Sequence, residues 1–170
     1  MGVEKLACRV ALLATVAISI QAQTIITTVA GKGRVLPGLG SPATSAPLAI
    51  PRGIAFDSKG NLYIADMQEN VVFVLRPNGT ITVFAGTGVA GFSGDGGPAT
   101  AAQLLLPVAV AVDASDNVYI IDFHNARVRK VDRGGTITTI AGGGEAYDSG
   151  EIPATATTLF EPNGSAFDSS

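Results

Sequence analysis

The sequence has no tryptophan, few charged residues and one cysteine near its N-terminus. Of its 170 residues, 15% are charged and 46% are hydrophobic. This composition excludes an intrinsically disordered chain, which is poor in hydrophobic residues and rich in charge. No apolar run reaches the roughly 18 residues that a membrane-spanning helix needs, so we expect no membrane span. The formal net charge of −3 argues against attraction to phosphates, and we expect no nucleic-acid partner.

Residues 1–22 have the pattern of a secretory signal peptide. Basic residues precede an apolar run at residues 10–20 that is too short to cross a bilayer. Ala22 places a small residue at the cleavage position, so the mature chain is expected to begin at Gln23. A buried N-terminal helix of the fold is the alternative. We therefore expect a protein that is secreted, periplasmic or on the cell surface.

Cleavage at this point would remove Cys8, the one cysteine of the sequence. The exported chain would then lack disulfides, cysteine-ligated zinc and a cysteine nucleophile. Loss of Lys5, Arg9 and Glu4 would leave nine basic and thirteen acidic residues, a formal net charge of −4.

A repeat organises the rest of the chain. Residues 51–88 and 107–144 align at a constant offset of 56, with 15 identities in 38 positions. Partial copies flank them, because residues 24–31 match the end of the unit and residues 162–170 match its beginning. A Pro-Ala-Thr connector also recurs, starting at Pro42, Pro98 and Pro153. Self-similarity at a fixed period is typical of repeat architectures.

Turn residues divide each unit into four short strands. In the first unit these are Arg52–Phe56, Leu62–Ala65, Val71–Leu75 and Thr80–Ala85. The inner strand of the second unit, Val108–Val112, is apolar on both faces, whereas Arg127–Val131 alternates arginine with valine like a solvated outer strand. A four-stranded meander with a buried inner strand is a propeller blade. A β-sandwich is the alternative, but it does not explain the constant offset.

We therefore predict an all-β fold, a partial β-propeller. It has two complete four-stranded antiparallel blades, at residues 51–86 and 107–142, plus single strands from two flanking blades at residues 24–31 and 162–170. Closed propellers contain about four to eight blades. The prediction is therefore that residues 23–170 are a fragment, and that the missing blades of its full-length chain are its partners.

The second unit resembles an NHL-repeat β-propeller. The matching segments are Asp113 to Asp122, Asn125-Ala-Arg-Val-Arg129 and Gly135 to Gly142. The connector from Phe92 to Thr100 is similar to that of a long-repeat bacterial variant, like the NHL region of teneurins. The first unit departs from the pattern, because Glu69, Val71 and Phe73 stand at the positions of Asn125, Arg127 and Arg129.

This resemblance implies a disc of about six blades that binds proteins, RNA or small ligands. In some relatives it implies a lyase or lactonase with a metal in the central tunnel. We single out His124, Arg127 and Arg129 as candidate ligand-binding residues. His124, the one histidine, could be a general acid or base, or a surface loop residue. The two arginines belong to the one basic cluster, and they also fit a solvated strand face.

We expect no catalytic residues, metal ligands or cofactor in this chain, although the tunnel of a full-length propeller could hold a metal. The recurring Asp57, Asp66, Asp113 and Asp122 indicate capped turns. Asp95 alone falls far short of the about six to eight oxygen ligands of calcium. The sequence thus favours an exported, non-catalytic scaffold that binds a protein, a glycan or a small ligand. The alternative is part of a propeller enzyme, a metal-assisted lyase or lactonase.

Two short segments also match the acceptor pattern for N-glycosylation. They are Asn78-Gly-Thr80 and Asn163-Gly-Ser165. The first coincides with an expected hairpin turn, which favours Asn-Gly for conformational reasons, so the match says little about modification.

Overall fold

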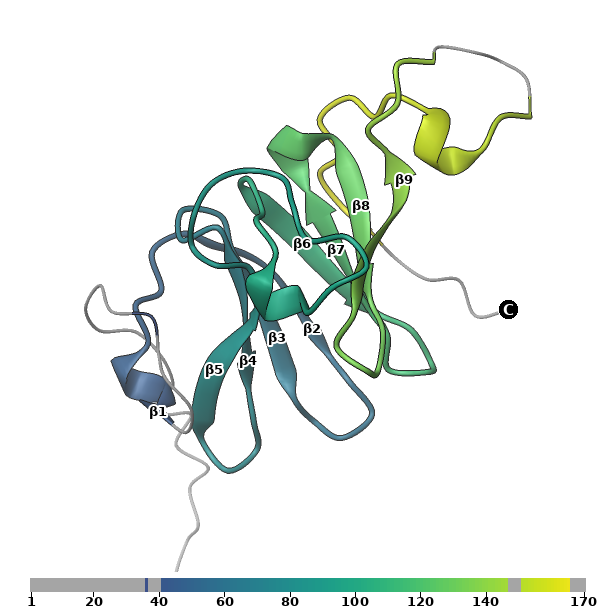
Figure 1. The fold of residues 1–170 in the computed structure, drawn as a ribbon. Coiled ribbons are helices and arrows are strands. Elements are labelled where there is room, and N and C mark those ends of the chain that lie inside the picture. The colour runs from purple at the N-terminus through teal and green to yellow at the C-terminus, as the bar shows by residue number, and fades with distance from the viewer. Residues whose placement is uncertain (1–35, 37–40, 147–150, 166–170) are drawn as a thin grey trace, which may run out of the picture.

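The computed structural model describes residue 36 and residues 41–146 and 151–165. These residues form two antiparallel sheets, which lie side by side in Figure 1. The first sheet has the order β1-β5-β4-β3-β2, with β1 (Ser41–Pro42), β2 (Pro51–Phe56), β3 (Leu62–Asp66), β4 (Val71–Leu75) and β5 (Thr80–Ala85). The second has the order β6-β7-β8-β9, with β6 (Pro107–Val112), β7 (Val118–Asp122), β8 (Arg127–Val131) and β9 (Ile137–Gly142).

The all-β class and the two four-stranded blades are confirmed, with strand ends close to those expected from the sequence. We call β2–β5 blade 1 and β6–β9 blade 2. The two sheets do not close into a ring. Of the flanking strands expected at residues 24–31 and 162–170, the first lies outside the described residues. Residues 162–165 form no strand, and the rest of that segment is also outside the described residues.

Each blade begins with the same irregularity in its inner strand. The pairing of β2 with β3 shifts between Pro51 and Gly53, and that of β6 with β7 shifts between Pro107 and Ala109. A Cβ on Gly53 would lie 2.6 Å from the Cα of Ala109. The two inner strands therefore approach so closely that the position two residues after the opening proline requires a very small residue.

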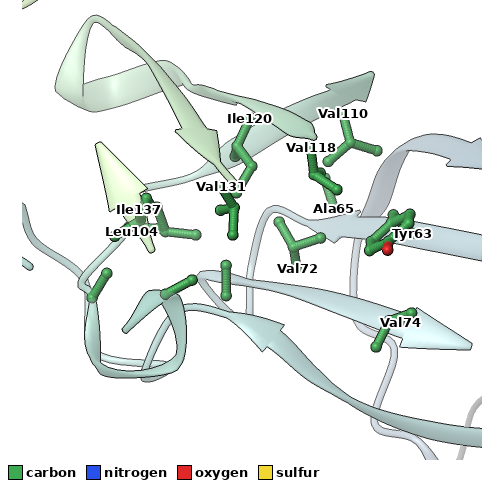
Figure 2. Close-up of a cluster of buried hydrophobic side chains, with 13 residues drawn as sticks. Tyr63, Ala65, Val72, Val74, Leu104, Val110, Val118, Ile120, Val131 and Ile137 are labelled. Carbon is green, nitrogen blue, oxygen red and sulfur yellow. The ribbon is translucent and has the colours of Figure 1, made fainter. Parts of the chain in front are cut away.

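The main core lies between the blades, as Figure 2 shows. Blade 1 contributes the sheet face that carries Tyr63, Ala65, Val72 and Val74, and blade 2 contributes the opposing face with Val110, Val118, Ile120, Val131 and Ile137. Side chains on alternate positions of a strand share one face, so the period-two patterns of the sequence form this interface. Each blade thus buries its apolar face mainly against the other.

The other face of blade 1 is only partly covered. A second cluster there contains Phe73 and Ile81, with Leu36 packed against it. Ile54 and Phe56 are each 64% exposed on this side. An apolar groove of about 520 Å³, lined in part by Phe56 and Leu75, opens next to them. Among the described residues, none packs over this inner part of blade 1.

The three Pro-Ala-Thr connectors all fold into short 3-10 turns. These are η1 (Ala43–Ser45), η2 (Ala99–Ala101) and η4 (Ala154–Ala156). In η2, the Ala99 carbonyl accepts the N–H of Gly86 at the end of blade 1, at 3.0 Å. The Ala99 N–H donates to Gly135 of blade 2, at 2.9 Å. The recurring connector therefore joins the outer parts of neighbouring blades.

The remaining turn, η3 (Phe123–Asn125), links β7 to β8. In the part of the chain that the structure describes, no helix is long and apolar enough to cross a membrane.

Candidate functional site at the connector end

The two ends of each blade differ in what they carry. In Figure 1, the hairpin turns within β2–β3, β4–β5, β6–β7 and β8–β9 lie at the lower end. The upper loops of the connector between the blades lie with η3 at the upper end, which we call the connector end, whereas η2 lies lower and bonds to Gly135 of the β8–β9 turn. The three candidate residues belong to η3 or to β8, the strand that follows it. His124 lies in η3, Arg127 is the first residue of β8, and Arg129 is in the middle of β8.

Arg129 is fully buried and holds the connector on blade 2. Its Nε and Nη2 donate to Asp95 at 3.1 and 2.8 Å, and Nη2 also donates to the Ser93 carbonyl at 3.1 Å. Its Nη1 lies 3.4 Å from Asp122 and 3.5 Å from the Gln103 carbonyl. A side chain with 0% exposure cannot reach solvent. The expectation of a solvated face was therefore wrong for Arg129, whose guanidinium binds the protein's own connector.

Asp122 completes this cluster from the end of β7. It accepts the backbone N–H of Leu105 at 2.8 Å and the Asn125 amide at 2.7 Å. Burial raises its pKa, and the hydrogen bonds and the charge of Arg129 offset this only in part. Asp66 has the same place in blade 1, where it accepts four backbone N–H groups, from Ala49, Ile50, Gln68 and Glu69. Asp66 therefore caps its turn, as its recurrence predicted. Asp122 accepts no backbone N–H of η3 and instead holds the connector and the Asn125 side chain, so the capping prediction was wrong for its backbone contacts.

Arg127 lies at the surface of the same region. Its guanidinium carbon is 3.8 Å from the centre of the Phe92 ring. Its Nη1 donates to the Asn125 carbonyl at 2.8 Å and its Nη2 to the Gly143 carbonyl at 3.4 Å. Gly143 has a φ of 82°, which favours glycine, and its lack of a side chain leaves room for the guanidinium. Arg127 is thus held between an aromatic ring and the backbone while its side chain remains partly exposed.

His124 is exposed in η3. Its ring stacks on Phe123 with centroids 4.9 Å apart, and its backbone N–H donates to the Leu105 carbonyl at 3.1 Å. The structure therefore brings Arg127 and Arg129 together around one aromatic ring, since Arg129 also lies 4.8 Å from the Phe92 centroid. His124 lies in the adjoining turn.

Sequence reasoning missed the apolar contribution of the connector. Phe92 is 41% exposed and Val89 is 58% exposed. The amide of Asn125 donates to the Gly91 carbonyl at 2.8 Å, which ties this stretch to η3. The presence of a phenylalanine within a glycine-rich connector could have indicated this apolar contribution. We define the connector-end surface as Val89, Phe92, His124 and Arg127.

The opposite end is built from a repeated aspartate turn. Asp57 accepts the backbone N–H groups of Lys59 and Asn61, the Asn61 amide and the Tyr63 hydroxyl. Burial acts to raise the pKa of Asp57, but these hydrogen bonds outweigh it and hold the pKa below the ordinary aspartate value. Burial, assisted by the charge of Asp57, raises the pKa of Tyr63 to about 12. The turn-capping role predicted for Asp57 is confirmed.

A short link also joins the two blades at this end. Asp116 accepts the backbone N–H and the hydroxyl of Ser58, at 3.0 and 2.9 Å. A small polar hollow of about 200 Å³ lies beside it, lined in part by Lys59, Asp132 and Arg133. Across the described ranges, no three His, Cys, Asp or Glu side chains gather in a way that could hold a metal ion.

Comparison with known proteins finds similarity to one family over part of the chain. Residues 88–163 match the model of the teneurin NHL domain. The chain is 39% identical over 98 residues to teneurin-3 of Danio rerio and 34% identical over 104 residues to teneurin-1 of Gallus gallus. The alignments cover 49% and 54% of this chain but 4% of each teneurin. The chain thus spans a small part of the curated relatives it matches.

Solved structures agree at the level of the fold. A structural genomics protein of unknown function from Bacteroides thetaiotaomicron has a TM-score of 0.58 and 24% identity, and covers 72% of this chain. An auxiliary nutrient binding protein from the same organism has a TM-score of 0.53 and 20% identity, over 68% of this chain. In each case the alignment covers 32% of the solved chain. Together with the repeat and its connectors, these matches show that the chain is similar in sequence to the teneurin NHL domain and similar in fold to solved β-propeller-like structures.

Proposed function

We propose that this chain is an exported, non-catalytic propeller module that binds a protein, a glycan or a small ligand through its connector-end surface. The observation that carries the proposal is the geometry of Arg127. The residue is fixed over Phe92 and against Gly143, yet it remains partly exposed. Phe92, against which it packs, and Val89 of the same connector expose apolar side chains.

Such an arrangement suits recognition for two reasons. Arginine and aromatic residues are enriched among the residues that dominate binding energy. A side chain that is already held in place loses little conformational freedom when a partner binds, which favours affinity. The remaining N–H groups of Arg127 suit a carbonyl, hydroxyl or carboxylate acceptor, while Phe92 suits an apolar group or the face of a sugar ring.

The non-catalytic part of the proposal is supported by how the chain uses its ionisable groups. Asp66 and Asp122 hold backbone N–H groups of the connectors, and Asp57 caps a hairpin turn. Asp95 is paired with Arg129. These carboxylates stabilise the fold. The contact between a connector N–H and the aspartate recurs at Asp66 and Asp122, whereas the Asp95–Arg129 pair belongs to blade 2.

The proposed export depends on residues 1–22, which lie outside the described residues. Expression of the full sequence in a secreting host tests it. The expected result is a product in the periplasm or medium whose N-terminus, read by mass spectrometry, is Gln23. A product retained in the cytoplasm with residues 1–22 intact would overturn this part of the proposal.

Binding is tested by probing a glycan array and a peptide array with the full chain. We expect Arg127→Ala to weaken any signal by about tenfold or more, the loss typical of a central arginine contact. The matched control is Arg133→Ala, which removes an exposed arginine at the opposite end of blade 2. Equal losses in both variants, or no change in either, would exclude the connector-end surface as the binding site.

The enzyme alternative makes a different prediction. A metal-assisted lyase or lactonase would retain zinc or calcium in stoichiometric amount after dialysis. Elemental analysis of a complete homologue, whose blades close the tunnel, distinguishes the two, and a stoichiometric metal there would overturn the non-catalytic proposal.

A further inference from the structure

The chain contains nearly the same tetrapeptide in two different structural settings. The sequence Pro-Asn-Gly-Thr starts at Pro77, and Pro-Asn-Gly-Ser starts at Pro162. Asparagine followed by glycine is the dipeptide most prone to lose its side-chain amide, because glycine leaves the next backbone nitrogen free to approach the side chain. The two copies therefore offer a matched comparison within one molecule.

The first copy is locked in the turn between β4 and β5. The Gly79 N–H donates to the Arg76 carbonyl at 2.9 Å. The side-chain oxygen of Asn78 accepts both the N–H and the hydroxyl of Thr80, at 3.1 and 2.7 Å. Both the attacking nitrogen and the group it would attack are thus held in hydrogen bonds. Reaction at Asn78 requires the turn to open first.

The second copy is exposed and lies outside any strand. The amide nitrogen of Asn163 donates to the Glu161 carbonyl at 2.9 Å, which leaves the side-chain carbonyl unoccupied among the described residues. Within the same described part, the Gly164 N–H makes no hydrogen bond. An added Cβ at Gly164 would meet nothing within 4 Å, so the surroundings are open.

The repeat explains why glycine stands at residue 164. Pro162 is equivalent to Pro51 and Pro107, so Gly164 is equivalent to Gly53 and Ala109. That position requires a very small residue where two inner strands approach closely. The small residue that suits the repeat thus creates an Asn-Gly pair in a segment that is not paired as a strand here.

We propose that Asn163 is a site of spontaneous deamidation and isoaspartate formation in the folded protein, whereas Asn78 is protected. The Gly164 nitrogen, once its proton passes to base in solution, attacks the Asn163 side-chain carbonyl carbon. A carbon–nitrogen bond forms, the bond to the side-chain nitrogen breaks, and ammonia leaves. Water then opens the cyclic imide at either carbonyl, which yields aspartate or isoaspartate.

The isoaspartate product would change the chain at a sensitive position. Its backbone runs through the side-chain carboxyl and is longer by one carbon. Asn163 is equivalent to Arg52 and Val108, the residues at which the inner-strand pairing shifts register. A longer backbone there is incompatible with the strand pairing of blades 1 and 2. Both products add negative charge, and the isoaspartate product would prevent residues 162–165 from forming an inner strand.

The test follows both sites in one sample. The folded full chain is incubated at mildly alkaline pH, digested at acid pH, and the peptides that contain Asn78 and Asn163 are quantified by mass spectrometry. Enzymatic methylation of isoaspartate identifies the product. We expect Asn163 to react about tenfold faster or more, since a structured site reacts only through local opening. In denaturant, the two sites should react at similar rates.

Two variants check the cause of the difference. Gly164→Ala should slow the reaction at Asn163 and leave the rate at Asn78 unchanged, because the added methyl group hinders attack without a clash. Thr80→Val should accelerate the reaction at Asn78, because it removes the hydroxyl that the Asn78 side chain accepts. Equal rates at the two sites in the folded chain, or a faster reaction at Asn78, would overturn the proposal.

Discussion

Blades 1 and 2 have equivalent strands, turns and connectors. The contact between the connector and the sheet is apolar in blade 1 and ionic in blade 2. In blade 2, Arg129 is buried against Asp95 of its connector and lies near the Phe92 ring. The equivalent residue of blade 1 is Phe73, which is fully buried in a cluster that includes Leu36. Leu36 is the repeat equivalent of Phe92, since both precede their Pro-Ala-Thr turn by six residues.

The difference shows that strand and connector vary together. A buried arginine is stable only if its charge and donors are satisfied, and the glycine-rich connector of blade 2 supplies a carboxylate and carbonyls for this purpose. A phenylalanine needs only apolar neighbours. The position of Arg129 and Phe73 thus accepts either a charged or an apolar side chain, provided that the connector over it supplies polar or apolar partners, respectively.

The largest effect is expected from breaking the ionic contact on one side. Arg129→Met should lower the free energy of unfolding by about 3–5 kcal/mol, because it leaves the buried Asp122 without its positive partner. Urea unfolding followed by circular dichroism measures the change. A loss below about 1 kcal/mol would show that Asp122 does not depend on the charge of Arg129 for its stability in the folded protein.

Copying the apolar contact of blade 1 into blade 2 should recover much of this loss. Arg129→Phe combined with Asp95→Leu and Asp122→Asn removes the three charges together, so none is left unpaired. We expect the triple variant to lose about 2–3 kcal/mol less unfolding free energy than the sum of the losses measured for the three single substitutions. Strict additivity of the measured values would contradict the interpretation that strand and connector vary together.

A smaller gain is expected from giving blade 2 a contact that blade 1 already has. Asn70 has a φ of 54° and its side-chain oxygen accepts the Leu106 N–H at 2.9 Å. Its equivalent is Ala126, with a φ of 52°. Ala126→Asn should raise stability by about 0.5–1 kcal/mol, because asparagine tolerates this conformation better than alanine. Thermal unfolding is the measurement, and Ala126→Leu is the control expected to lower stability.

The smallest effect concerns a feature that the blades have in common. Burial acts to raise the pKa of Asp113, but hydrogen bonds from Asn117, Tyr119 and Ser115 hold it below the ordinary value. A lowered pKa contributes stability that is present above about pH 4 and is lost as the pH falls through the folded-state pKa. In Asp113→Asn, the loss of unfolding free energy between neutral and acid pH should be smaller by about 0.5 kcal/mol or less, since the group is near solvent. Unfolding measured at neutral and acid pH tests the sign.

The sequence predicted most of the fold because the repeat and its turn residues repeat the same local chemistry. A proline opens the inner strand of each blade, and glycine, asparagine and aspartate turns separate the apolar strands that follow. It did not predict the burial of Arg129. An Arg-Val alternation reads as one solvated face, and the partner, Asp95, lies 34 residues away in a connector. Only the return of the connector over β8 reveals the pair.

The candidate site shows the same limit. His124 and Arg127 could be selected from residue type and position, and both lie at the connector end. The contribution of Phe92 and Val89 depends on how the glycine-rich connector folds, which has no periodic pattern to interpret. Long-range contacts of irregular segments are therefore what sequence reasoning left undetermined.

The close approach of Gly53 to Ala109 and the bridging of the outer strands by η2 have a joint geometric consequence. Inner strands separated by little more than backbone, with a whole turn inserted between the outer ones, give each blade pair the shape of a wedge. The taper of that wedge determines the curvature of any ring assembled from such pairs. Enlarging the inner residue or shortening the connector should therefore flatten the ring and increase the number of blades that it holds.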